Sequence, residues 1–220
     1  MTDASSAVTE ALPEAGSKRR QIRPKAERRQ QLIDATIRCI AQHGLSAVTM
    51  QMVTREAGLS VGIANLHFES KDNLLKETLR FVAEEYHGGQ IDIMEGGDIP
   101  DLGERLDALL DFQLGRGVTQ RQKMSVWFAY YGEAGARPVY QKIVSTVDRL
   151  AAQKLEALFT DIIREGGYQD VDARELATGY SALIDGLQLG LLVTPRELSK
   201  RRARAVARDF LRRAFPRHID

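Results

Sequence analysis

The sequence is poor in cysteine and in long apolar runs. Cys39 is the only cysteine among 220 residues, so no intramolecular disulfide can form, and a reducing compartment such as the cytoplasm fits. Because Cys39 lies in an apolar helical stripe, we expect it to be a small buried hydrophobe. Residues 1–16 contain no apolar run long enough for a signal peptide, and we expect no segment to span a membrane.

Patterns typical of enzymes and metal sites are also missing. The sequence contains no glycine loop that would cradle a phosphate, no nucleophile elbow, and no His or Cys cluster with the spacing of metal ligands. The four histidines are scattered along the chain, at His43, His67, His87 and His218. We therefore expect no enzymatic activity, no cofactor and no metal.

The net charge of +1 says nothing about a nucleic-acid partner, but the distribution of charge is uneven. Residues 18–29 contain seven basic residues against one acid. This cluster is either a set of phosphate contacts or a solvated charged arm. Residues 196–217 contain nine basic residues against two acids. They form either a second nucleic-acid patch or the solvated face of a helix that pairs with the acidic stretch 92–104.

Hydrophobic periodicity predicts an all-α protein of about nine helices, without repeats or convincing strands. Residues 1–17 are typical of a disordered tail. Residues 87–100, with four glycines and a proline, indicate a loop, or a continuation of the preceding helix. The helices expected from periodicity, caps and stop signals are Pro24 to Gly44, Met50–Ala57, Val61–Phe68, Lys71 to about Tyr86, Leu102–Leu114, Thr119–Gly132, Pro138–Glu165, Val171–Val193 and Leu198–Phe215.

The most informative segment is the pair of short helices around residues 57–60. The length of the helices and of their connection is that of a helix-turn-helix. Gly58 can adopt the left-handed conformation that the turn needs, and Thr49 and Ser60 are suitable N-caps. The second helix of this pair, Val61–Phe68, has no bulky side chain at Gly62, Ala64 or Asn65, which would let it lie deep in a major groove.

Several short segments together resemble the DNA-binding signature of the TetR family of repressors. They are IDAT at 33–36, HG at 43–44, TM at 49–50, EAGLSVG at 56–62 and HFESKDNLL at 67–75. The resemblance implies an all-α homodimer with a DNA-binding domain, here residues 18–70, and a ligand-binding and dimerisation domain, here residues 71–220. The implied partners are double-stranded operator DNA and a small-molecule effector, whose binding releases a pseudo-palindromic operator. An activator would have the same sequence features.

Carried over residue by residue, the resemblance implies a set of DNA contacts. Thr49 and Lys71 match phosphate-binding positions. The family often shows two tyrosines where this chain has Asn65 and His67, so Asn65 is a candidate for reading adenine instead. We expect Leu66, Phe68, Leu74 and Leu75 to belong to the core. The complete set of expected DNA contacts is Arg28, Thr49, Ser60, Val61, Gly62, Ile63, Ala64, Asn65, His67 and Lys71.

The C-terminal part resembles the TetR subgroup that contains the choline-responsive repressor of glycine betaine synthesis. The segments WFAYY at 127–131, PVY at 138–140 and ALIDGLQLG at 182–190 carry this likeness, although the subgroup commonly has tryptophan where Gln188 stands. Aromatic faces hold quaternary ammonium groups by cation–π attraction. The candidate cage residues are Phe112, Trp127, Tyr130 and Tyr131, with Asp111, Glu133 or Asp185 as the countercharge. A neutral apolar or aromatic ligand fits the same residues, and aromatics at helical spacing also pack in cores.

The last two long helices are the expected dimer interface. One carries a broad apolar stripe with glycines that would permit close approach, and two copies of the pair would form a four-helix interface. The expected residues are Leu176, Tyr180, Leu183, Ile184, Leu187 and Leu191, with Gly179, Gly186 and Gly190, and Ala203, Val206, Phe210 and Leu211 from the final helix. An interaction module, in which the helix-turn-helix packs against protein, is the remaining alternative to DNA binding.

Overall fold

A computed structural model describes residues 24–115, 117 and 119–219. Within these residues the chain forms nine α-helices and no strand, as the periodicity predicts. The tail 1–17 and the first part of the basic cluster, residues 18–23, lie outside the described residues. The helices are α1 (Lys25–His43), α2 (Met50–Ala57), α3 (Val61–Phe68), α4 (Lys71–Met94), α5 (Leu102–Leu114), α6 (Arg121–Ala134), α7 (Pro138–Gly166), α8 (Ala173–Val193) and α9 (Lys200–Ala214).

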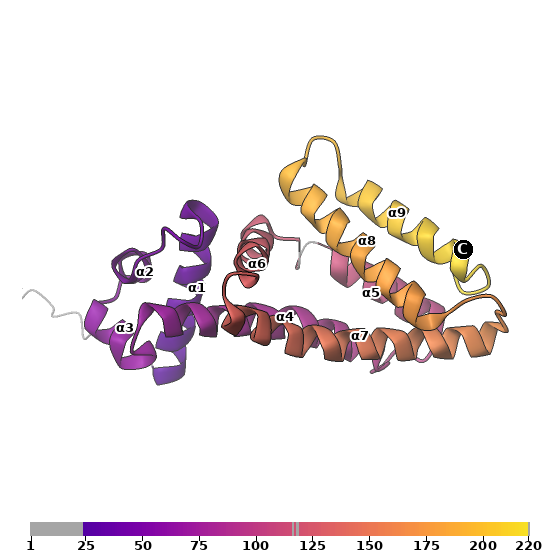
Figure 1. Cartoon of the computed structure of the whole chain (residues 1–220), viewed down its shortest axis with the longest axis horizontal. Coiled ribbons are helices and arrows are strands. Elements are labelled where there is room, and N and C mark those ends of the chain that lie inside the picture. Colours follow the sequence, from indigo (N-terminus) through magenta and orange to yellow (C-terminus); the bar gives the residue numbers. More distant parts are fainter. Residues whose placement is uncertain (1–23, 116, 118, 220) are drawn as a thin grey trace, which may run out of the picture.

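The molecule is elongated, and two long helices form its spine (Figure 1). The short helices α2 and α3 gather with α1 at one end, whereas α5, α8 and α9 lie toward the other. Helix α4 leaves the first group and runs beside α7 along the length of the molecule. Helix α6 lies between α1 and α8 and contacts both. Helices α4 and α6 therefore link the two ends.

Local sequence signals account for the helix-turn-helix. The side chains of Thr49 and Ser60 accept hydrogen bonds from the backbone N–H groups of Met52 and Ile63, which caps α2 and α3. Between the helices, Gly58 adopts the left-handed conformation with φ 64° and ψ 33°. A residue with a β-carbon would be strained there, so the expected role of this glycine is confirmed.

Helix α4 extends beyond Tyr86, the end expected from its apolar periodicity. It continues through Gly88 and Gly89 to Met94. Of the two alternatives for residues 87–100, continuation holds as far as Met94. A β-carbon on Gly89 would lie 2.4 Å from the ring of Phe112. The glycine therefore lets α5 pack closely on α4, and this packing offsets a helix-propensity cost of about 1 kcal/mol.

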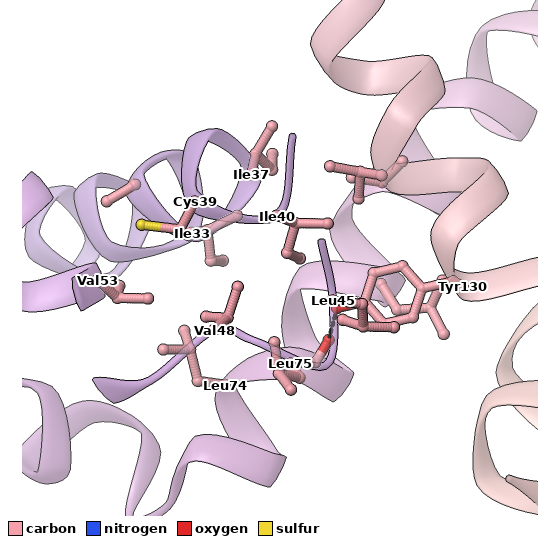
Figure 2. Close-up of a cluster of buried hydrophobic side chains, with 14 of the residues drawn as sticks. Ile33, Ile37, Cys39, Ile40, Leu45, Val48, Val53, Leu74, Leu75 and Tyr130 are labelled. Carbon is pink, nitrogen blue, oxygen red and sulfur yellow. Dashed lines mark hydrogen bonds between the residues drawn. The ribbon is translucent and has the colours of Figure 1, made fainter. Parts of the chain in front are cut away.

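The core consists of two clusters of buried side chains. The first joins α1, α2 and α3 to the first half of α4 and to α6, and it contains the buried Cys39. In this cluster Tyr130 is fully buried, and its hydroxyl donates a hydrogen bond of 2.6 Å to the carbonyl of Leu75 (Figure 2). The expected domain boundary between residues 70 and 71 therefore runs through the first core cluster, to which both parts of the chain contribute.

The C-terminal helices pack differently from the expected dimer stripe. Tyr180, Ile184 and Leu191 are buried within the protomer, in the second core cluster, because α8 packs on α7 and α9. The basic face of α9 pairs with α5: Arg204 and Arg208 form ion pairs with Asp107, and Arg204 also pairs with Asp111. These acids lie one to two turns beyond the stretch that we expected to supply them.

Candidate functional site

Helix α3 has an exposed surface directed away from the core. Val61 and Leu66 are exposed to 38% and 77%, and Gly62 and Asn65 are exposed beside them. We call these four residues the α3 face. Apart from the Asn65 amide it is apolar. A β-carbon on Gly62 would meet only the hydroxyl of Ser60, at 3.8 Å, so packing within the protein does not require glycine at this position.

The opposite side of α3 packs into the first core cluster. Ala64 and Phe68 are fully buried, and Ile63 is half-buried. Ala64 therefore faces the core and not a groove, whereas Leu66, which we expected in the core, is exposed. The helical period explains both corrections, since residues 64 and 68 are one turn apart and residue 66 lies on the other side.

The first turns of α2, α3 and α4 bring polar groups to the same end of the molecule (Figure 1). Thr49 and Ser60 are exposed at the starts of α2 and α3. At the start of α4 the Lys71 ammonium donates a hydrogen bond of 3.0 Å to the carbonyl of Val48, which holds α4 against the beginning of α2. Lys71 remains exposed, so its other ammonium protons can reach a further acceptor.

Basic residues of the first turn of α1 lie close to α3. Burial lowers the pKa of His67, and the charges of Lys25, Arg29 and Arg28 lower it further. His67 is therefore a neutral hydrogen-bonding group at pH 7, and the positive charge around it comes from α1. Arg28 is half-buried, donates to Gln31 and remains near α3.

A cavity of about 220 Å³ lies between α4, α6, α7 and α8. Trp127 is at the centre of its aromatic wall. The ring centroid of Trp127 lies 4.9 Å from that of Tyr131, 5.8 Å from Tyr86 and 5.6 Å from His87. We call this space the cage cavity, because aromatic rings from two helices surround it.

Two carboxylates, Asp148 and Asp185, also line the cage cavity. The hydroxyl of Tyr131 donates to Asp148 over 3.4 Å, and the Nε2 atom of His87 lies 2.9 Å from Asp148 without the alignment of a hydrogen bond. Burial raises the pKa of Asp185 to about 6, the charge of Asp148 raises it too, and His87 partly opposes both. No lysine or arginine is among the described residues that line this cavity, so its charge is negative at neutral pH.

A second cavity, of about 340 Å³, lies on the other side of Tyr86 and Trp127. Its wall is mainly apolar and includes Phe112. The carboxylates at its edge are already paired, Glu85 with Lys123 and Asp111 with Arg204. We call it the neutral cavity.

The structure brings together three of the five expected ligand residues, namely Trp127, Tyr131 and Asp185, in the cage cavity. Phe112 lines the neutral cavity instead. Tyr130 lines neither cavity among the residues described, because its ring belongs to the core and its hydroxyl is engaged by Leu75.

The other two candidate countercharges are engaged elsewhere: Asp111 pairs with Arg204, and Glu133 with Arg137 at 3.0 Å. The residues that sequence reasoning missed are Tyr86, His87 and Asp148. They lie in stretches whose helical pattern is compatible with core or surface, and only the packing of α4 on α7 brings them to the cavity.

Gln188 lines the neutral cavity, at the position where the resembling subgroup commonly has tryptophan. Its side-chain amide donates 3.0 Å to the hydroxyl of Tyr86 and 2.9 Å to the carbonyl of Gln113. Gln188 thereby holds Tyr86, whose ring lines both cavities, without itself adding an aromatic face.

An exposed helix-turn-helix, joined by continuous helices to a helical body that contains cavities, defines the class of one-component transcriptional regulators. Two family matches give this class a name. Residues 32–78 match the tetR family of bacterial regulatory proteins, and residues 102–216 match the C-terminal domain of BetI-type transcriptional repressors. The chain belongs to the TetR family, with a BetI-type C-terminal domain. It is a DNA-binding transcriptional repressor and not an enzyme.

Individual relatives agree with this assignment. The chain is 28% identical over 189 residues to the HTH-type transcriptional regulator BetI of Escherichia coli O17:K52:H18, an alignment that covers 86% of this chain and 94% of that protein. A transcriptional regulator from Saccharomonospora viridis, solved in complex with choline, is 30% identical with a TM-score of 0.75 and covers 84% of this chain and 96% of its own. A regulator from Pseudomonas aeruginosa PAO1 has the same fold, with a TM-score of 0.78 at 24% identity over 91% and 97% of the two chains.

Proposed function

We propose that this repressor responds to a small quaternary ammonium cation, with choline as the model ligand, bound in the cage cavity. The observation that carries the proposal is the combination of Trp127, Tyr131 and Tyr86 with two carboxylates that no lysine or arginine in the described lining neutralises. Aromatic faces and a nearby negative charge are what a quaternary ammonium group requires, since its nitrogen has no N–H with which to donate a hydrogen bond. The choline complex of the S. viridis relative supports the same chemistry.

The two cavities favour different ligands. Placing a cation in the neutral cavity would bring it near carboxylates that Lys123 and Arg204 already pair. The cage cavity instead offers carboxylates that no lysine or arginine of the described lining pairs, in a partly buried setting where electrostatic attraction exceeds that in water. The observed geometry therefore favours the cage cavity for the cation.

For DNA recognition we propose that the α3 face enters the major groove. Thr49, Ser60 and Lys71 lie where they can contact phosphates, together with the basic residues of α1. Two such units in a dimer would read the half-sites of a pseudo-palindrome about one helical turn apart.

The ligand signal would travel through α4 and α6. Tyr86 is on α4 and Trp127 on α6, and both helices pack in the core cluster that holds α1, α2 and α3. The Tyr130–Leu75 hydrogen bond joins the same two helices on the side of α3. A cation that draws the cage rings together would shift α4 and change the spacing of the two DNA-binding units. A coupling free energy of about 1–3 kcal/mol suffices for such a switch.

For dimerisation we propose a stripe on α8 that keeps Gly179 and Gly186 from the expected set and otherwise differs from it. Small and apolar residues with a 3–4 spacing are exposed along it, namely Gly179, Ala182, Gly186, Leu189 and Val193. Among the described helices α8 alone is long and apolar enough to cross a membrane by length and composition, yet only 33% of its most apolar window is buried in the protomer. A second copy of α8 and α9 would cover the apolar surface that the protomer leaves open.

The replacement Leu189→Ala should weaken the dimer about 30-fold. Leu189 is 43% exposed in the protomer, and loss of its contact costs roughly 1 kcal/mol for each subunit. Sedimentation equilibrium measures the dissociation constant. Leu150→Ala is the matched control, because Leu150 is 46% exposed on α7, outside the proposed stripe. Equal dissociation constants for Leu189→Ala and the wild type would contradict the α8 interface.

The proposed function is tested with choline and its neutral isostere 3,3-dimethylbutan-1-ol, in which carbon replaces the quaternary nitrogen. Choline should bind at least about tenfold more tightly in calorimetry, because only the cation gains cation–π and carboxylate attraction. At saturation, choline should also release a labelled operator duplex from the repressor, as measured by fluorescence anisotropy.

Two results would contradict the cation proposal. Equal affinities for choline and the isostere would show that charge is not recognised, and they would favour a neutral effector in the neutral cavity. Tight choline binding without release of the operator would assign choline a role other than induction.

A further inference from the structure

Leu66 is more exposed than any other large apolar side chain in the part of the chain that the structure describes, with 77% of its surface open. It lies in the middle of α3, where folding provides it with no partner, since the core side of the helix is formed by Ala64 and Phe68. Together with the exposed Val61 it gives the α3 face a continuous apolar surface beside polar groups, and such a surface marks a contact that forms with a partner.

The other proposed contacts of the protein do not use Leu66. The α8 stripe lies in the half of the molecule remote from α3, and the cage cavity lies between α4, α6, α7 and α8 (Figure 1). The surroundings of α3 are basic and not apolar, with Lys25, Arg28 and Arg29 close to His67. This charge favours DNA over a protein partner as the occupant of the α3 face.

We infer that Leu66 recognises the 5-methyl group of a thymine in the major groove. Thymine is the only standard base that presents an apolar group there, whereas the other bases present hydrogen-bond donors and acceptors. A leucine gains nothing from a phosphate, so base contact is the favourable use of its exposed surface. The inference rests on the proposed placement of the α3 face in the groove, and it assigns a base to one position of the operator.

Neighbouring residues are compatible with this contact. Gly62 precedes Leu66 by one turn and leaves open space on the same side, so that the helix can approach the base edges closely. The exposed Asn65 adds a hydrogen-bonding amide beside the apolar contact, suited to adenine. Each half-site should therefore contain at least one required thymine close to the bases that Asn65 contacts.

The test replaces the thymine methyl with hydrogen and changes nothing else. Duplexes that bind the wild-type dimer are first enriched from a randomised pool. Each thymine of the enriched sequence is then replaced by uracil, symmetrically in both half-sites, and affinity is measured by fluorescence anisotropy. At one position the wild type should lose about fourfold per half-site, or about 15-fold in all, as expected for one buried methyl group.

At the same position, Leu66→Ala should bind the thymine and uracil duplexes equally, whereas Leu66→Met, which keeps apolar reach, should retain the preference. Because Leu66 is exposed, Leu66→Ala should melt at the wild-type temperature. The inference would be overturned if replacing thymine with uracil lowered affinity equally in the wild type and in Leu66→Ala. It would also be overturned if uracil lowered affinity at no position. Either result would leave DNA binding intact. Failure of the wild type to enrich any sequence would overturn the placement of the α3 face as well.

Discussion

Replacing both Asp148 and Asp185 with asparagine is expected to weaken choline binding at least about 100-fold. A cation about 5 Å from one carboxylate gains roughly 3 kcal/mol at an effective dielectric constant near 20. Asp148 contributes less than that, because its side chain is 38% exposed and partly screened by water. Asparagine keeps the shape of aspartate, removes the charge and replaces one acceptor oxygen with an amide NH2 group. Calorimetry with choline measures the loss.

The neutral isostere 3,3-dimethylbutan-1-ol provides the control for this prediction. Its affinity should change by less than about threefold in the double variant, because it does not interact with the lost charges. Asp111→Asn is the matched control variant, since Asp111 pairs with Arg204 at the edge of the neutral cavity. The carboxylates are a cleaner target than Trp127, which is 6% exposed and belongs to the core. Choline affinity that survives in the double variant would exclude the cage cavity as the cation site.

The pH dependence of binding follows from the raised pKa of Asp185. With a pKa of about 6 in the free protein, protonation should weaken choline binding about tenfold between pH 7.5 and pH 5. Asp148 and His87 face the same cavity. Asp185→Asn separates their contributions, because it should bind weakly and show a flatter pH profile.

The same shift has the opposite effect on stability. A folded-state pKa above that of the unfolded chain means that the ligand-free protein loses stability as the pH rises through about 6. Asp185→Asn should therefore raise the free energy of unfolding at pH 7.5, by on the order of 1–3 kcal/mol, while it lowers choline affinity. The ionised carboxylate of Asp185 thus destabilises the ligand-free fold at pH 7.5.

The fold follows from short-range signals and could be predicted closely. The helices Val61–Phe68 and Leu102–Leu114 have the predicted bounds, because a capping residue precedes each. Helix α2 ends before Gly58, which adopts a left-handed φ. The C-terminal end of α4 could not be predicted as closely from the sequence. Two glycines suggest a break, and only the close packing of Phe112 on Gly89 explains why the helix continues.

The sites were harder to predict because they depend on which side of a helix meets which neighbour. The segment around Trp127 supplies three of the expected ligand residues, but the helical period places Tyr130 in the core and Trp127 and Tyr131 at the cage cavity. The same reasoning separates Ala64 from Leu66 on α3. Asp148 carries no sequence signal at all, since only the packing of α7 beside α4 brings it to His87.

The replacement Gly62→Ala is expected to stabilise the protein and to weaken operator binding, two effects of opposite sign. Glycine within a helix costs about 0.5–1 kcal/mol relative to alanine, and the added β-carbon would enter open space in the free protein. Close approach of α3 to base edges leaves no room for it, so each half-site should lose at least about tenfold and the dimer about 100-fold, provided each clash costs roughly 1.4 kcal/mol. Melting temperature and fluorescence anisotropy with the enriched duplex measure the two effects.

Gly132→Ala is the matched control for this pair of effects. Gly132 is helical, exposed and free of neighbours within 4 Å of an added β-carbon, but it lies on α6 and not on the α3 face. It should gain similar stability and keep the wild-type affinity for the operator. Gly62→Ala with unchanged operator affinity would mean that the start of α3 stays clear of the groove. The glycine would then have no explanation either in the packing of the protein or in its contact with DNA, because helix propensity alone favours alanine.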